Sequence, residues 1–165
     1  MTSPHQDPRT YVVPVQDGQY YIEASGGRGG DWLDPQDGLT TGQSNWVAIF
    51  TGTQWGPVTL RLQSLPERST DLETGWEMIV ERDIVTADGG LAVVSTYSAG
   101  SGGMKLPPGR GRLRIHVRDR AVALRHSKLE SPLETHFIQV WPSSEPQAPA
   151  VLLGPDDVAS QISPN

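Results

Sequence analysis

Six basic side chains recur at every second position of one short stretch. They are Arg110, Arg112, Arg114, His116, Arg118 and Arg120. The positions between them include Leu113, Ile115 and Val117. Because successive side chains of a strand point to opposite faces, this pattern predicts a half-buried β-strand with a basic outer face. Such a row can bind phosphates, and each neutralised charge would make the affinity depend on salt.

Two other interpretations explain the same row of charges. Its side chains can pair within the molecule, on a solvated outer face, with acids of neighbouring strands; the candidates are Glu77, Glu81, Asp83 and Glu134. Alternatively, the row is a docking face for a protein. The stretch lacks the interleaved aromatic residues on which bases stack. We therefore rank intramolecular pairing first, a protein partner second and nucleic acid third.

The residue types used in catalysis show no recognisable spacing. The histidines are His5, His116, His126 and His136, and no pair of them has the spacing of metal ligands. A nucleophile elbow, a phosphate-binding loop and a dinucleotide fingerprint are all missing. His116 and His136 could meet across adjacent strands, which is the one arrangement left for a hydrolase. The sequence predicts no catalytic residues, no cofactor and no enzymatic activity.

The glycine-rich segment of residues 25–38 contains both acidic residues and a tryptophan. Asp31, Asp34 and Asp37 are three residues apart, whereas a calcium loop requires oxygens at alternate positions, so we predict no metal site. Trp32 in this segment and Trp55 in a later loop could each anchor a partner, with Asp31 beside Trp32. Burial of these indoles under their loops is the interpretation that we rank first.

Composition and charge limit the class of protein. The 165 residues suit one domain, and the absence of Cys excludes disulfides and thiolate metal sites. The net charge is −6, yet eight of the 13 Lys and Arg residues lie between Lys105 and Lys128. Such asymmetry can steer a charged partner. With no signal-like or membrane-spanning apolar run, we expect a cytoplasmic protein that does not interact with membranes.

The frequent Gly and Pro residues favour short strands joined by turns. Segments rich in β-branched and aromatic residues predict about eight strands, most clearly at 45–51, 58–62, 76–85, 91–97 and 134–141. We therefore predict an all-β fold, an antiparallel β-sandwich, with a closed β-barrel as the alternative. The expected layout is a disordered N-terminus at 1–10, one sandwich domain at 11–142 and a Pro/Ser-rich tail at 143–165, which Val151–Leu153 could anchor.

The order of these segments resembles the competence protein J family. The features that carry the likeness are Asp31-Trp32, the strand Trp46–Phe50, the alternating Val58–Leu62, Trp76-Glu77, the turn Leu106–Gly109 and Trp141-Pro142. Together they span about residues 11–142. The resemblance implies a small β-sandwich with no catalytic residues. It also implies a nuclease as the partner, because the known member of that family inhibits a DNA-entry nuclease.

These observations lead to two functional hypotheses. The first is a non-enzymatic protein-binding module, an inhibitor or immunity-type partner of a nuclease or toxin, whose acidic surface would occupy a phosphate-binding cleft. The second is a ligand- or nucleic-acid-binding β-module that uses the basic strand. The predicted binding residues are Arg110, Arg112, Arg114, His116, Arg118, Asp31, Trp32 and Trp55.

Overall fold

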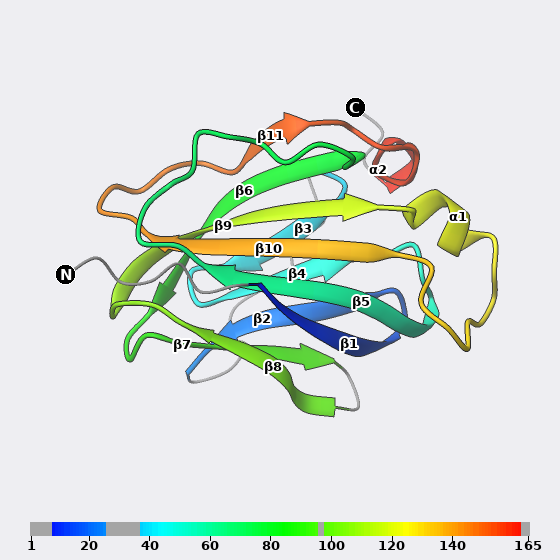
Figure 1. Ribbon diagram of the computed structural model, residues 1–165, viewed down its shortest axis with the longest axis horizontal. Coiled ribbons are helices and arrows are strands. Elements are labelled where there is room, and N and C mark those ends of the chain that lie inside the picture. Colours follow the sequence, from blue (N-terminus) through cyan, green and yellow to red (C-terminus); the bar gives the residue numbers. More distant parts are fainter. Residues whose placement is uncertain (1–7, 26–36, 96–97, 163–165) are drawn as a thin grey trace.

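The computed structural model describes residues 8–25, 37–95 and 98–162, and most of these lie in strands (Figure 1). The strands are β1 (Arg9–Gln16), β2 (Gln19–Ala24), β3 (Thr40–Gln43), β4 (Trp46–Phe50), β5 (Trp55–Ser64), β6 (Met78–Thr86), β7 (Gly90–Ser95), β8 (Ser98–Lys105), β9 (Gly109–Arg118), β10 (Thr135–Pro142) and β11 (Ala150–Leu153). The helices α1 (Arg120–Leu124) and α2 (Asp157–Ile162) are short. The prediction of an all-β fold is confirmed.

The strands form one curled sheet whose two halves face each other. We call the half with strand order β11-β6-β9-β10-β5-β1 the front layer, because it lies towards the viewer in Figure 1. The back layer contains β8, β7, β2, β4 and β3. A hairpin joins the layers at Asp17-Gly18, where both residues have positive φ, as this two-residue turn requires.

The sheet is mixed, which corrects the prediction of a purely antiparallel one. β5 and β10 run parallel, with Thr135 paired with Thr59 and Val140 paired with Ser64. Parallel neighbours need a long connection, and here β6, β7, β8, β9 and α1 all intervene in sequence. The described residues form 11 strands, more than the predicted eight, because β3, β8 and β11 are too short or too rich in small residues to show a clear strand pattern.

The main core fills the space between the two layers. Leu113, Ile115 and Val117 of β9 belong to it, as their alternation predicts, and so do inward-facing residues of β1, β2, β4, β5, β6, β7 and β10. Burial of this apolar area provides most of the free energy that favours the folded state.

The C-terminal segment is part of the fold rather than only a tail. β11 pairs with β6 through Ala150–Glu81 and Val151–Val80, and α2 follows with Val158 and Ala159 buried. The pairing of β11 with β6 joins this segment to the sheet. At the other end, β1 begins at Arg9, and the preceding residues 1–7 lie outside the described part.

Candidate binding surfaces

The row of basic side chains on β9 is largely buried. Arg112, Arg114 and His116 are only 3%, 0% and 1% exposed, so the prediction of a solvated basic face is wrong for them. Arg110 and Arg118 at the two ends of the strand keep partial exposure. Arg120 is fully buried beyond the strand, where two hydrogen bonds of 2.7 and 2.6 Å join its guanidinium to Asp156.

Two acids of the neighbouring strand β6 neutralise these arginines. Glu81 lies 2.8 Å from Arg114 and 3.4 Å from Arg112, and Asp83 accepts a 2.8 Å hydrogen bond from Arg112. Burial raises the pKa of Glu81, but hydrogen bonds and positive charges of Arg114 and Arg68 outweigh it and hold that pKa below its ordinary value. The predicted intramolecular pairing is present, but in a buried network.

Two segments cover this network from outside. The Arg114 guanidinium donates a 2.7 Å hydrogen bond to the carbonyl of Ser69, in the loop between β5 and β6. Arg112 donates to the carbonyls of Gln147 and Ala148, in the segment between β10 and β11. These carbonyls accept hydrogen bonds from arginine N–H groups that would otherwise be available to a phosphate. We call Arg112, Arg114, Glu81 and Asp83 the buried charge network.

Aromatic side chains complete the cover over the basic row. The His116 ring stacks on Phe137 at 4.9 Å between centroids and lies 5.4 Å from Trp76, while the Arg114 guanidinium lies 5.2 Å from the centre of the Trp141 ring. Trp76 and Trp141 are both buried. Burial lowers the pKa of His116, so its Nδ1–H donates to the carbonyl of Phe137 from a neutral ring.

His116 and His136 do not meet, which removes the arrangement considered for a hydrolase. In the register of β9 and β10, His116 faces Phe137 and His136 faces Val117, so the two rings point to opposite faces of the front layer. His136 points into the core instead, where its Nδ1 lies 2.7 Å from Tyr20 Oη and its Nε2 lies 2.5 Å from Glu134.

Glu134 anchors this inner cluster to a backbone turn. Its Oε1 accepts hydrogen bonds from the amides of Gly52 and Thr53 at 2.9 and 2.8 Å. Burial and the nearby charge of Glu134 raise the pKa of Tyr20 well above its ordinary value, so the phenol stays protonated and donates to His136. Because Tyr20, Glu134 and His136 are all fully buried, the cluster ties strands together and is closed to a substrate.

Trp55 is the sequence-predicted binding residue that the structure exposes most clearly. Its exposed fraction is 42%, and it begins β5 on the outer face of the front layer. Pro57 on the same face pairs with Pro14 of β1, and the next outward position of β1 is Val12, which is 59% exposed. Exposed Leu133 precedes β10 nearby. We call Val12, Pro14, Trp55, Pro57 and Leu133 the apolar surface.

An acidic segment lies over the same face. The loop of residues 66–77 contains Glu67, Asp71, Glu73 and Glu77, all exposed, against the single cation Arg68, and it also exposes Leu72. Arg61 of β5 pairs with Glu73 at 3.3 Å, so the acidic loop contacts β5. This contact lies two residues along β5 from Thr59, which pairs with Val12 of the apolar surface. The four acids of this loop are the feature of the sequence from which its negative charge could have been predicted.

Asp31 and Trp32 lie outside the described residues. Asp37, the last acid of that series, accepts hydrogen bonds from the amides of Leu39 and Thr40 and so shapes a turn. In the part of the chain that the structure describes, no group of three His, Asp or Glu side chains could hold a metal ion. Neither described helix is long and apolar enough to cross a membrane.

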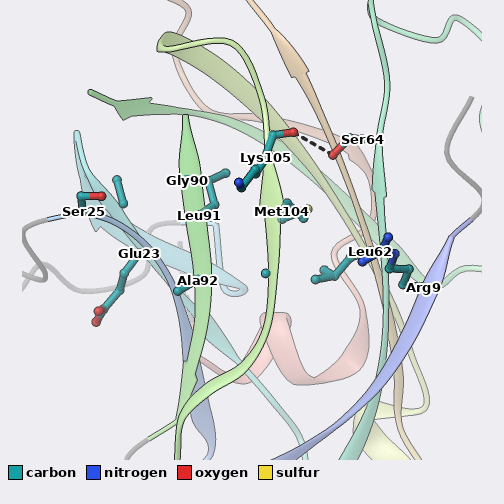
Figure 2. Close-up of a pocket in the computed structure, with 12 residues that line it drawn as sticks. Arg9, Glu23, Ser25, Leu62, Ser64, Gly90, Leu91, Ala92, Met104 and Lys105 are labelled. Atoms are coloured by element: carbon teal, nitrogen blue, oxygen red, sulfur yellow. Dashed lines mark hydrogen bonds between the residues drawn. The ribbon is translucent and has the colours of Figure 1, made fainter. Parts of the chain in front are cut away.

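A pocket of about 540 Å³ opens where the two layers separate, next to β7 and β8 (Figure 2). Leu62, Leu91 and Met104 form its apolar floor, and Arg9, Glu23 and Lys105 are among its polar lining residues. Ser64 donates a hydrogen bond of 3.2 Å to the carbonyl of Lys105, which joins β5 to β8 beside the pocket.

Comparison with known proteins defines the class of fold. No family model and no curated protein sequence matches the chain. Two solved structures are similar. One is ComJ, inhibitor of the DNA degrading activity of NucA, from Bacillus subtilis, with a TM-score of 0.60 and 12% identity over 84% of this chain and 97% of that chain. The other is described as Crocagin biosynthetic gene J, with a TM-score of 0.56 and 13% identity over 84% and 100% of the two chains.

The chain therefore has a ComJ-like fold, and the resemblance predicted from its sequence is confirmed at the level of fold. At such low identity the likeness concerns the arrangement of strands. What the chain binds has to be argued from its own surface.

Proposed function

We propose that this protein is a non-enzymatic binding module that inhibits a nuclease or a similar toxic enzyme by covering its substrate cleft. The observation that carries the proposal is the fold it has in common with ComJ, described as an inhibitor of the DNA degrading activity of NucA. Inhibition by binding needs a stable complementary surface and no cofactor. The outer face of the front layer offers such a surface.

The acidic loop and the apolar surface complement a nuclease in different ways. A nuclease cleft that binds DNA is basic, so an acidic loop can occupy it and can also speed association by electrostatic attraction. Exposed Trp55 supplies the kind of aromatic anchor on which interface affinity depends most. Both features lie on one face, and the Arg61–Glu73 ion pair joins the acidic loop to β5, the strand that also carries Trp55 and Pro57.

The predicted binding residues differ in their expected contribution to this binding face. Trp55 becomes central, and the roles of Asp31 and Trp32 remain predictions. Arg110 and Arg118 keep enough exposure to contact a partner at the margin, whereas Arg112, Arg114 and His116 act from inside the fold. Binding of nucleic acid by the basic strand is disfavoured, because Arg112 and Arg114 are buried and already bound to Glu81, Asp83 and the carbonyls of two backbone segments.

A pull-down followed by an inhibition assay tests the proposal. The tagged protein is used to purify partners from its native lysate, each partner is produced separately, and its degradation of labelled DNA is measured with increasing amounts of this protein. We expect inhibition that saturates near a one-to-one ratio. Recovery of no partner, or of partners whose activity does not change, would contradict the proposal.

A charge reversal in the acidic loop tests the surface. Asp71→Lys should weaken inhibition, and the difference from the wild type should shrink as salt is added. Asp157→Lys, at an exposed position of α2, makes the same change of charge elsewhere and serves as the matched control. Equal effects of the two variants would show that net charge, rather than the loop, determines binding.

A further inference from the structure

The pocket between the layers has the composition of a ligand site. Its volume of about 540 Å³ lies within the range of small-molecule pockets, and its floor consists of Leu62, Leu91 and Met104. In Figure 2, Leu62 from β5 and Met104 from β8 project into the space between the layers. The pocket lies apart from the apolar surface, so this inference does not depend on the proposed function.

The floor residues differ from the rest of the core in their contact with solvent. Most members of the main core are 0–1% exposed, whereas Leu62, Ala24, Leu91 and Met104 are 3%, 5%, 4% and 8% exposed. These four also line the pocket. The core thus reaches solvent here through apolar side chains, and an apolar ligand that covered them would be favoured by the hydrophobic effect.

The reason for the opening lies in the strand pairing. β1 pairs with β5 along its whole length but with β2 only at Gln16–Gln19, so its N-terminal half has no strand on its other side. β8 pairs with β7 alone. Tyr11 of β1 packs against Gly102 of β8, and beyond this contact the pocket lies between Arg9 and Met104.

The polar lining residues define the charge of the ligand. Arg9 and Lys105 are exposed, and neither side chain forms a hydrogen bond or an ion pair with any residue that the structure describes. Both are therefore available to an anion. Glu23 lies on the opposite side of the pocket from Arg9 (Figure 2), and the two cations of the lining come from β1 and β8.

We propose that this pocket binds a small amphiphile with one anionic group, a monocarboxylate on an apolar chain. The apolar chain covers Leu62, Leu91 and Met104, and the carboxylate remains at the opening with Arg9 and Lys105. None of the pocket's described lining residues belongs to the apolar surface that we propose as the nuclease-binding face.

Calorimetric titration of the full chain with decanoate, below the concentration at which decanoate forms micelles, tests this site. We expect saturable one-to-one binding. Decanol lacks the charge, decyltrimethylammonium reverses it and butyrate lacks most of the chain, so each should bind several-fold more weakly. Equal affinity for decanoate and decyltrimethylammonium, or no saturable decanoate binding, would overturn the proposal.

Neutralising the two cations locates the ligand. The double variant Arg9→Gln, Lys105→Gln should weaken decanoate binding by about three- to tenfold, in line with exposed ion pairs. Arg125→Gln, Lys128→Gln removes the same charge from exposed positions after α1 and should bind like the wild type. Both variants change exposed side chains, so folding is preserved. Decanoate should also shift the amide NMR signals of Gly90, Leu91 and Met104; shifts confined to other strands would contradict the assignment.

Discussion

The outer face of the front layer has two regions with opposite character. Over β6 and β9 it carries charged side chains, yet it is covered and nearly dry. Over β1 and β5 it carries apolar side chains, yet it is open to solvent. The charged region stabilises the fold, and the apolar region is available to a partner. Residue type alone would therefore predict the opposite: a charged region open to a partner and an apolar region buried in the fold.

Removing the central acid of the buried charge network should have the largest effect. Glu81→Ala leaves Arg114 buried without its counter-charge and leaves Arg112 with Asp83 alone, and the loss of a buried charge partner costs about 3–5 kcal/mol of the free energy of unfolding. Urea denaturation followed by tryptophan fluorescence measures this. The comparison is Glu73→Ala, which breaks the exposed pair with Arg61 and should cost about 1 kcal/mol or less. If Glu81→Ala and Glu73→Ala lower the free energy of unfolding by the same small amount, the buried charge network is accessible to water.

Replacing a tryptophan should likewise cost much more stability in the covered region than in the open one. Trp141 is 4% exposed and packs against Arg114, so Trp141→Ala should destabilise the protein by about 3–5 kcal/mol. Trp55→Ala should change the free energy of unfolding by about 1 kcal/mol or less, since this side chain is already in contact with water. Thermal unfolding of the two variants separates the outcomes, and equal losses would remove the distinction between the regions.

A smaller effect should appear in the pH dependence of stability. Burial lowers the pKa of His116 below its ordinary value of 6.5, so below pH 6.5 the unfolded chain binds a proton that the folded chain does not. Stability should therefore fall as the pH decreases through 6.5 towards the lowered pKa of the folded state, and then stop changing on this account. His116→Gln should flatten this part of the profile in urea titrations at several pH values. If the pH dependence of stability is the same in His116→Gln and the wild type, a group other than His116 takes up the proton.

The smallest effect concerns nucleic acid. Because the buried charge network neutralises the basic strand, Arg110→Glu should not change retention on DNA-cellulose at low salt, where the wild type is itself expected to flow through. Strong, salt-sensitive retention of the wild type that Arg110→Glu abolishes would contradict this view and support the alternative hypothesis.

The sequence predicted the features that depend on local pattern. The alternation of Leu113, Ile115 and Val117 placed β9 against the core. The pairing of Glu81 and Asp83 with β9 was also predictable, because charges of opposite sign lie on adjacent strands.

What the sequence did not predict depends on contacts between distant segments. Nothing local shows that Ser69 and Ala148 come to lie over Arg114 and Arg112, so the second, outer cover of β9 was missed. Trp76, Phe137 and Trp141 were the available signal, since a solvated sheet face rarely carries several large aromatic residues. The parallel pairing of β5 with β10 is equally non-local.

The most direct test of the two-region view is a titration of the partner nuclease with Trp55→Ala and with Arg118→Ala. Both residues lie at least partly at the surface, Trp55 in the apolar surface and Arg118 at the end of the basic row, above the Trp76 ring. We expect Trp55→Ala to raise the inhibition constant roughly 30-fold, as for the loss of a contact worth about 2 kcal/mol, and Arg118→Ala to change it little. Unchanged inhibition by folded Trp55→Ala, together with a large loss for Arg118→Ala, would contradict the assignment of the open apolar region as the binding face.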